Sequence, residues 1–221
     1  PWIVPSPHTI HESQGEVTPF PSLRIYLPKK LQKSKRDLEN SWSQLPNFDY
    51  AFSNQKKANV QVALENLGQE EAYALSIKQD GINISVQSPK GLMYAFYSLH
   101  QIMSHCLREG KNWPVLEVKD APRYAYRGFM FDVARNFYGK EKIFQILDYL
   151  AYFKINHFDI RITDDEGWRI EIPGLPELTE VGAKRGYDPT EQAYMIPAYG
   201  SGSKGQPRGS GFLTTQDYME V

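Results

Sequence analysis

The chain has 221 residues, of which 41% are hydrophobic, and its 25 basic and 26 acidic side chains leave a formal net charge of -1. This length and apolar content suffice for one large or two small hydrophobic cores. A nearly neutral chain has no strong field to attract nucleic acid or an acidic membrane surface, so we expect neither as a partner. No apolar stretch approaches the roughly 20 residues that a membrane-spanning helix needs.

Cys106 is the single cysteine of the sequence, so no disulfide can form within the chain. Its apolar neighbours at helical spacing, Leu99, Ile102 and Met103, predict a buried thiol with a structural role. The sequence begins Pro-Trp-Ile without a methionine, from which we expect a processed amino terminus and a secreted or periplasmic protein.

Residues 1–120 carry patterns that predict a small α+β domain. Apolar and polar residues alternate from Ala72 to Ile77 and again from Ile82 to Val86, which is typical of strands. Between them, Asp80-Gly81 predicts a tight hairpin turn, because glycine tolerates a positive φ. Two further strand candidates are residues 23–27 and 60–64.

A helix is predicted to cover this sheet. Ser88 can cap its amino terminus and Pro89 suits its first turn, while Gly110 marks its end. One helical face collects the apolar side chains of Leu92, Ala95, Phe96, Leu99, Met103 and Cys106. A sheet with one covering helix makes a compact two-layer unit.

Residues 121–221 alternate strand and helix patterns. Residues 128–133 form a nearly continuous apolar run, which predicts a strand buried on both faces. An amphipathic helix is expected over residues 141–154, and a second strand over residues 158–162 completes a βαβ unit.

The last part of the chain has a different composition. Between Gly186 and Gly211, glycine, serine, proline and tyrosine predict a long irregular loop. Thr214-Thr215-Gln216-Asp217 then indicates the start of another helix, since threonine is a common helix cap.

Polar side chains cluster around the two strands of the predicted βαβ unit. Arg127 lies where the first strand begins. Near the carboxyl ends of the two strands follow Asp132, Arg135 and Asn136, and then Asp164, Asp165, Trp168 and Arg169. Ligand sites of α/β architectures lie beyond the carboxyl ends of strands. Carboxylates and guanidinium groups bind hydroxyls and an indole stacks on a sugar ring, so a carbohydrate is the expected ligand.

These residues also have simpler explanations. An Asp-Asp pair after a strand commonly caps a turn, and an arginine beside a tyrosine commonly lies over apolar atoms at the surface. A non-catalytic carbohydrate-binding or interaction module is therefore an alternative to an enzyme. A metal-dependent hydrolase using Asp164, Asp165 and Glu166 is a third alternative, although no histidine or fourth ligand accompanies them at useful spacing.

The stretch from Pro122 to Gly182 resembles glycoside hydrolase family 20, the β-N-acetylhexosaminidases. Arg127-Gly-Phe-Met-Phe-Asp-Val-Ala-Arg-Asn-Phe137 and Thr163-Asp-Asp-Glu-Gly-Trp-Arg169 are similar to the family's first two barrel motifs. Residues 178–183 are similar to the segment that follows them. The predicted hairpin and helix of residues 71–101 resemble the small domain that precedes the barrel in this family.

The resemblance implies both a fold and an activity. The fold is an α+β domain over residues 1–120 and the start of a (β/α)8 TIM barrel over residues 121–221, with two of its eight strands. The activity is retaining exo-hydrolysis of terminal β-linked N-acetylglucosamine or N-acetylgalactosamine, with the sugar's own 2-acetamido group as nucleophile. We expect no cofactor and no metal, and the substrate is an amino-sugar-containing glycan or chito-oligosaccharide.

The resemblance also assigns roles to individual residues. Arg127 matches the arginine that grips sugar hydroxyls, and Asp132 and Trp168 are expected to bind substrate as well. Asp164, with Asp165 as the alternative, matches an aspartate that supports the catalytic glutamate through a histidine.

Two departures from the family pattern stand out. Asp159 and Arg161 occupy positions where the family often has histidines, and Asn136 stands where a histidine is common. The catalytic Asp-Glu pair of the family lies near the fourth barrel strand, and no matching segment is present in this sequence. A full barrel needs about 250 residues, so we expect the remainder of the same enzyme to complete this chain, which should be inactive alone.

Overall fold

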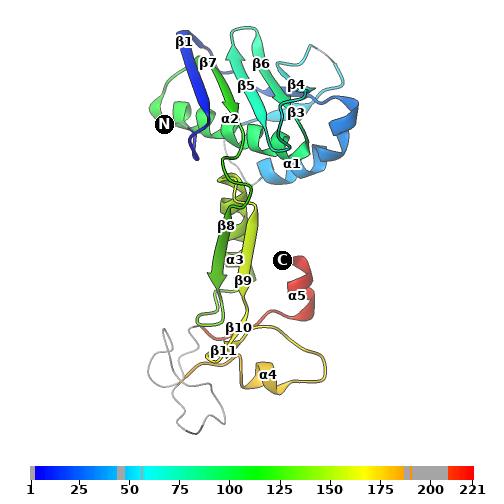
Figure 1. Ribbon diagram of the computed structural model, residues 1–221, viewed down its shortest axis with the longest axis vertical. Helices are drawn as coiled ribbons and strands as arrows, with labels where there is room; N and C mark the ends of the chain where they lie inside the picture. The colour runs from blue at the N-terminus through cyan, green and yellow to red at the C-terminus, as the bar shows by residue number, and fades with distance from the viewer. Residues whose placement is uncertain (1–2, 44–47, 56, 187–189, 191–208) are drawn as a thin grey trace. The chain divides into compact units, whose positions relative to one another are not determined.

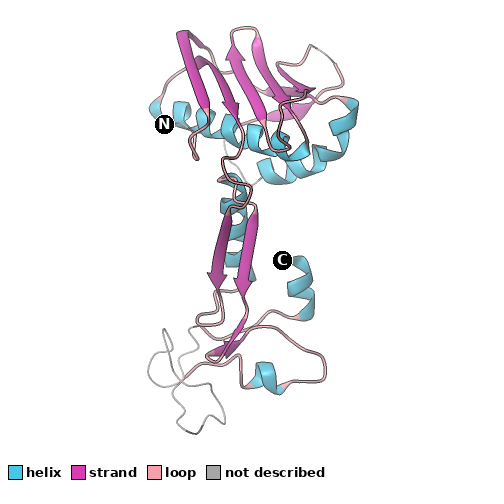
Figure 2. Ribbon diagram, in the orientation of Figure 1, coloured by secondary structure: helices cyan, strands magenta, loops and turns pink. Residues whose placement is uncertain are grey.

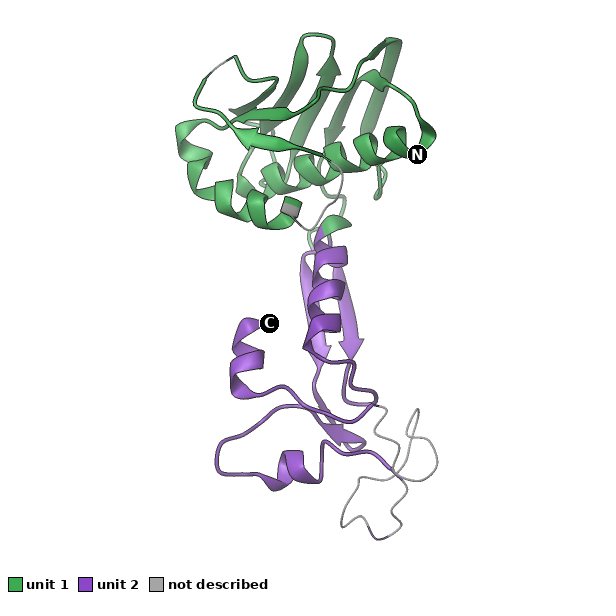
Figure 3. Cartoon of the chain, turned by 180° about the vertical axis from the view of Figure 1, so that it is seen from behind, with its two compact units in different colours: residues 1–125, 152–154 green, residues 126–151, 155–221 purple. Residues whose placement is uncertain are grey.

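The structure is a computed structural model that describes residues 3–43, 48–55, 57–186, 190 and 209–221. The chain divides into two compact units, which Figure 3 shows in different colours. Unit 1 comprises residues 1–125 and 152–154, and unit 2 comprises residues 126–151 and 155–221. Within the part of the chain that the structure describes, no helix combines the length and hydropathy that crossing a bilayer requires.

Unit 1 is built on a seven-stranded mixed sheet with the order β1-β7-β5-β6-β4-β2-β3 (Figures 1 and 2). Its strands are β1 (Thr9–Val17), β2 (Leu23–Tyr26), β3 (Tyr50–Phe52), β4 (Val60–Leu64), β5 (Tyr73–Lys78), β6 (Gly81–Val86) and β7 (Trp113–Asp120). Strand β2 runs parallel to β3 and β4, and β4 runs parallel to β6. The remaining pairs, β1 with β7, β7 with β5 and β5 with β6, are antiparallel.

The predicted hairpin is confirmed as the pair β5 and β6, whose register places Lys78 opposite Gly81. Gly81 has a φ of 149°, a conformation that side chains with a Cβ rarely adopt. A Cβ at this position would also lie 2.9 Å from the carbonyl oxygen of Asn59. Both the backbone angle and the close approach therefore require glycine here.

Helix α2 (Pro89–Glu109) covers the sheet as predicted. The Ser88 hydroxyl accepts a hydrogen bond from the backbone N–H of Lys90 at 3.1 Å, and Gly110 ends the helix in the left-handed conformation with a φ of 62°. The predicted apolar face is fully buried, and the buried thiol of Cys106 is confirmed as part of it. Burial raises the pKa of this thiol, so it stays protonated at neutral pH.

Unit 1 contains further elements that the sequence patterns did not resolve. A 3-10 helix, η1 (Lys29–Ser34), leads into helix α1 (Lys35–Ser43). The edge strand β1 is exposed along eight of its nine residues, so it carries no alternation of buried and exposed side chains.

Tyr152–Lys154 pack with unit 1 because of a buried polar network. The Lys154 ammonium lies 3.1 Å from the Asp120 carboxylate and 2.9 Å from the Tyr73 hydroxyl. The Tyr73 hydroxyl is also within hydrogen-bond distance, 2.6 Å, of Ser98. Burial first, and then the charge of Asp120, raises the pKa of Tyr73 well above its ordinary value, so this hydroxyl remains a neutral hydrogen-bonding group.

Unit 2 begins with the predicted βαβ unit, formed by β8 (Gly128–Asp132), α3 (Lys140–Tyr152) and β9 (His157–Arg161). The two strands are parallel, with Gly128 opposite His157 and Asp132 opposite Arg161. The expectation that the first strand is buried on both faces is wrong in this structure, because Phe129 and Met130 are 42% and 55% exposed. Among the described strands β8 pairs with β9 alone, and of its apolar side chains Phe131 packs against the cluster that contains Ile143 of α3.

The rest of unit 2 is made of short elements. A small hairpin consists of β10 (Thr163–Asp164) and β11 (Gly167–Trp168), and two short helices follow, α4 (Glu177–Glu180) and α5 (Thr215–Glu220). Helix α5 confirms the predicted helix start, and Thr214 and Asp217 form a reciprocal capping box at its amino terminus. Most of the loop predicted between Gly186 and Gly211 lies outside the described residues.

Candidate functional site

The carboxyl ends of the parallel strands β8 and β9 place the predicted carboxylates at one edge of unit 2. Asp132 is the last residue of β8 and lies opposite Arg161, the last residue of β9. Asp164 follows three residues after Arg161, in β10. The structure therefore brings Asp132 and Asp164 together where ligand sites of parallel sheets lie.

The centre of this edge is the guanidinium group of Arg135. Its Nη1 contacts the carboxylate of Asp132, its Nη2 lies 3.1 Å from Oδ2 of Asp164, and its Nε lies 3.6 Å from Oε1 of Glu166. The Arg135 side chain is 38% exposed, while that of Asp164 is 1% exposed. Each of the three guanidinium nitrogens thus faces a carboxylate, while part of the side chain stays exposed. We call these four residues the Arg135 cluster.

Asp164 is a buried carboxylate with two cationic neighbours. Besides Arg135, the guanidinium group of Arg161 contacts its Oδ2 atom. Its Oδ1 atom accepts a hydrogen bond of 3.3 Å from the backbone N–H of Glu166, so Asp164 also caps the turn between β10 and β11. Asp165, the alternative candidate, is exposed within that turn.

Hydrogen bonds between Asp132 and Arg135 favour the charged form of both groups. Burial acts to raise the pKa of Asp132, but hydrogen bonds from the backbone N–H and side chain of Arg135 outweigh it, and the pKa of Asp132 is lowered overall. The hydrogen bond to Asp132 in turn raises the pKa of Arg135, and the charge of Asp164 adds to this effect. Arg135 is therefore a cation held in place beside the carboxylate of Asp132.

Arg127 lies at the other end of β8. Its backbone N–H donates to Oδ1 of Asn156 at 2.9 Å, and its carbonyl oxygen accepts from the backbone N–H of Asn156 at 3.0 Å. A rise of about 3.3 Å per residue over five residues separates the backbones of Arg127 and Asp132 by roughly 16 Å. The structure does not bring Arg127 together with the Arg135 cluster.

Trp168 lies beside the cluster in the hairpin partner strand, opposite Thr163. Its indole N–H donates to the carbonyl oxygen of Ile170 at 2.6 Å, and its side chain is partly exposed. This hydrogen bond restrains the orientation of the indole ring.

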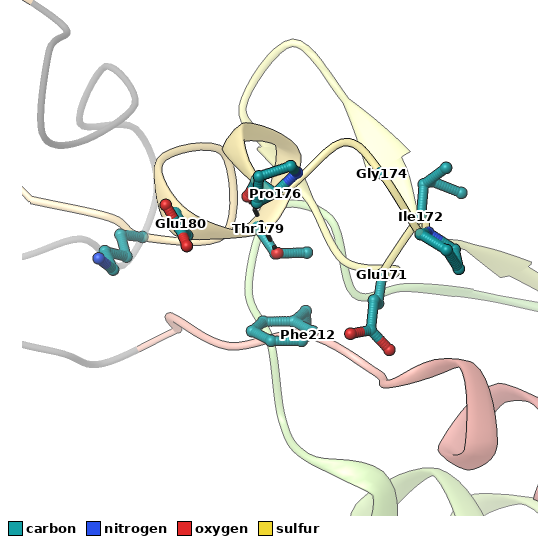
Figure 4. Close-up of a pocket in the computed structure, with 9 residues that line it drawn as sticks. Glu171, Ile172, Gly174, Pro176, Thr179, Glu180 and Phe212 are labelled. Atoms are coloured by element: carbon teal, nitrogen blue, oxygen red, sulfur yellow. Dashed lines mark hydrogen bonds between the residues drawn. The ribbon is translucent and has the colours of Figure 1, made fainter.

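A separate pocket of about 370 Å³ opens elsewhere in unit 2 (Figure 4). Its lining consists of Glu171, Ile172, Pro173, Gly174, Pro176, Thr179, Glu180, Lys184 and Phe212. None of the residues predicted for the site lines this pocket, so it supplies no part of the Arg135 cluster.

The donor set does not favour a metal centre. No group of three or more His, Cys, Asp or Glu side chains in the described ranges is arranged to hold a metal ion. Asp164 and Glu166, which the metal-dependent alternative requires, face arginine side chains. The arrangement instead suits recognition of a polar, uncharged ligand.

Comparison with protein families covers both units. The model of glycosyl hydrolase family 20, domain 2, matches residues 1–121, and the model of the family's catalytic domain matches residues 124–221. The chain belongs to glycosyl hydrolase family 20. The family predicted from the two barrel motifs is therefore confirmed.

Curated and solved members of family 20 resemble the chain closely. N,N'-diacetylchitobiase of Vibrio harveyi is 46% identical over 155 residues, which cover 70% of this chain and 17% of that protein. A beta-hexosaminidase of Vibrio vulnificus is 39% identical, covering 74% of this chain and 19% of its own length. The crystal structure of an exo beta-N-acetylglucosaminidase of Vibrio harveyi with N-acetylglucosamine is 29% identical, with a TM-score of 0.81, covering 99% of this chain and 33% of that one. The chain thus spans less than a fifth of the length of these curated relatives.

Within this family 20 chain, sequence analysis gave no individual role to Arg135. The residue stands in the quoted motif three positions after Asp132, just beyond the strand end. This position could have identified Arg135, because ligands of parallel sheets bind just beyond the carboxyl ends of the strands. From the sequence, Glu166 is named only as a possible metal ligand and Arg161 only as a departure from the family pattern. The contact of Glu166 with Arg135 joins separate segments, which only the fold brings together.

Proposed function

We propose that this chain is the amino-terminal part of a retaining exo-glycosidase that releases terminal β-linked N-acetylglucosamine or N-acetylgalactosamine. The observation that carries the proposal is the Arg135 cluster at the carboxyl ends of two parallel strands in a family 20 chain. The names of the curated relatives support the same activity, and a solved relative binds N-acetylglucosamine.

The proposed catalytic domain is a (β/α)8 barrel to which this chain contributes the first two strands. Strands β8 and β9 are parallel and are joined through α3, which is the repeating unit of such a barrel. The remainder of the same enzyme would pair with these strands and supply the catalytic Asp-Glu pair.

The proposed reaction proceeds by substrate assistance, as the family resemblance implies. The acetamido carbonyl oxygen attacks the anomeric carbon while the glycosidic bond breaks, and the catalytic glutamic acid protonates the leaving oxygen. Water then adds to the same anomeric carbon and reopens the ring formed by the acetamido group. Two inversions at one carbon give net retention.

We assign roles in this reaction to Arg135 and Asp164. The planar guanidinium group of Arg135 can donate to two neighbouring sugar hydroxyls at once, and its carboxylate partners fix its direction. Buried Asp164, held between two arginines, is our candidate for the residue that supports the acid. Arg127, the arginine chosen from the motif, stays a prediction, and its place at the amino end of β8 makes Arg135 the better-placed sugar ligand.

The proposal is tested with the full-length protein that contains this chain. Nitrophenyl N-acetyl-β-glucosaminide and nitrophenyl β-glucoside differ at the 2-position, so substrate assistance predicts that the glucoside reacts at least about a hundredfold more slowly. Proton NMR should show the β-anomer as the first sugar released. Equal rates, or the α-anomer first, would contradict the mechanism, and binding of N-acetylglucosamine without turnover would favour the carbohydrate-binding module.

A further inference from the structure

Two buried arginines hold the segment that carries Arg135 beyond the end of β8. Nε and Nη2 of Arg169 both donate to the carbonyl oxygen of Ala134, at 3.1 and 2.8 Å. Nη1 of Arg185 donates to the carbonyl oxygen of Arg135 itself. The carbonyl groups immediately before and after the Cα atom of Arg135 are therefore each fixed by a guanidinium group, and both groups lie in side chains that are at most 1% exposed.

The four hydrogen bonds recorded for the Arg169 guanidinium group all go to backbone carbonyl oxygens. Its Nη1 atom donates to the carbonyl oxygens of Ala183 at 2.7 Å and Gly211 at 3.2 Å. Burial, together with the neighbouring charge of Arg185, lowers the pKa of Arg169 to about 10, so the group is still charged at neutral pH. A buried charge is costly unless it is fully hydrogen-bonded, and here carbonyl dipoles from three separate segments provide those bonds.

The backbone of β11 packs closely against this contact. A Cβ built on Gly167 would lie 2.6 Å from the Ala134 carbonyl oxygen and 2.6 Å from Nη2 of Arg169. Glycine at this position therefore lets β11 lie directly against the hydrogen-bonded pair.

Arg185 acts on the side chain of Arg135 as well as on its backbone. Nη2 of Arg185 lies 3.5 Å from Oε2 of Glu166, and Oε1 of the same carboxylate lies 3.6 Å from Nε of Arg135. Glu166 therefore connects the two guanidinium groups. The backbone N–H of Arg185 donates to the Ser210 hydroxyl at 2.9 Å, which ties Arg185 to a further segment.

We propose that Arg169 and Arg185 are positioning residues that fix the backbone on both sides of Arg135 and so aim its guanidinium group at the bound sugar. Neither residue is placed to touch the sugar, since both are buried behind the segment they hold. That Arg135 binds the sugar rests on the proposed function. That Arg169 and Arg185 fix the backbone around Arg135 does not depend on it.

The first measurement tests whether Arg169 and Arg185 fix the backbone of residues 133–137. Lysine keeps the charge of arginine but lacks the planar fork whose separate nitrogens reach carbonyl groups on different sides, so Arg169→Lys should lose part of these hydrogen bonds. In the full-length protein, amide hydrogen exchange of residues 133–137 should be at least about tenfold faster in Arg169→Lys and in Arg185→Lys than in wild type. Arg36→Lys makes the same change at an exposed position of α1 and should leave this exchange unchanged.

The second measurement is a double-mutant cycle on kcat/KM for the aryl N-acetylglucosaminide. Arg169→Lys alone should lower kcat/KM about tenfold, mainly through KM. In an Arg135→Ala background it should cause no further loss, because its effect passes through Arg135. Ile143→Val, a substitution in the core of unit 2, provides the control in which stability falls while kcat/KM of the folded protein does not.

The outcomes separate the two proposals. Unchanged exchange at residues 133–137, or losses in kcat/KM that add independently of Arg135, would overturn the positioning role. An inactive wild type would overturn the proposed function, and the exchange measurement would still decide whether these arginines hold the segment. If Arg169→Lys does not accumulate as folded protein, Arg185→Lys carries both measurements, since it loses a hydrogen bond to the same segment.

Discussion

At the scale of single residues, the site depends on charged groups whose partners come from different parts of the chain. Arg135 faces three carboxylates, and Asp164 faces two arginines. Such mutual pairing offsets the cost of burying a carboxylate such as Asp164. The cluster is thus assembled within the chain before any ligand binds.

The two candidate sugar ligands can be separated by substitution in the full-length protein. Arg135→Ala should lower kcat/KM for an aryl N-acetylglucosaminide by at least about tenfold, because it removes charge-assisted hydrogen bonds at the ligand edge. Arg127→Ala, at the opposite end of β8, should change kcat/KM by less than about threefold. Initial rates decide between them, and thermal melting of each variant reports any loss of folded protein.

Arg135→Lys is the control substitution, because it keeps a positive charge beside Asp164 but loses the planar guanidinium group. It should recover stability lost in Arg135→Ala but little of the lost kcat/KM. A larger kinetic loss in Arg127→Ala than in Arg135→Ala would show that the motif-based choice of Arg127 was right.

At the scale of elements, helix α5 is held to α3 by one lysine. The ammonium group of Lys140 contacts the carboxylates of Asp217 and Glu220. Its hydrogen bond, followed by those from Thr214, lowers the pKa of Asp217 to about 2, and the pKa of Glu220 is lowered as well. The two carboxylates raise the pKa of Lys140 in return.

These shifts predict how the anchoring of α5 depends on pH. The pKa of Asp217 is lower in the folded state than its ordinary value of 3.8, so its contribution is full above about pH 4 and is lost as the pH falls toward 2. Lys140→Met should lower the exchange protection of the Tyr218 amide at pH 6, and the difference from wild type should shrink as the pH falls toward 2.

Lys142→Met is the control for that experiment, because Lys142 lies in the same helix and contacts Gln145 rather than α5. It should leave the Tyr218 amide unaffected at every pH. Protection that is equal in Lys140→Met and wild type at pH 6 would show that the capping box alone holds α5 in place.

At the scale of the whole molecule, the surface of unit 2 argues for the proposed completion by further barrel strands. Strand β8 exposes Phe129 and Met130 and has β9 as its partner among the described strands. Unpaired strand edges with exposed apolar side chains bind other strands, so residues 1–221 expressed alone should self-associate and show no glycosidase activity. Light scattering as a function of concentration measures the first property, and the aryl N-acetylglucosaminide assay measures the second.

Introducing the same positive charge at two exposed positions tests which surface of unit 2 drives self-association. Met130→Lys places a charge on the β8 surface and should reduce self-association, whereas Met219→Lys places the same charge on α5, where Met219 is 75% exposed, and should reduce it less. A stable monomer of the unsubstituted chain at high concentration, or turnover comparable with that of the full-length protein, would contradict the proposed completion.

Local sequence determined the elements whose geometry depends on neighbouring residues. The Asp80-Gly81 hairpin, the capped helix α2 and the βαβ pattern follow from turn chemistry, capping and the spacing of apolar residues, all of which act within a few positions. The two barrel motifs were likewise enough to identify the family to which the chain belongs. The edge strand β1 escaped this reasoning, because its exposed side chains carry no period and its pairing with β7 joins segments about 100 residues apart.

Only the tertiary structure decided which arginine stands at the ligand edge and what holds it there. The sequence places Arg169 among the polar side chains expected at a sugar site, yet it is fully buried among carbonyl groups of Ala134, Ala183 and Gly211. Those acceptors are backbone atoms, which every residue type carries, so no side-chain pattern marks them. They meet at one guanidinium group because the fold brings three distant segments to the same place, and that convergence is what fixes the direction of Arg135.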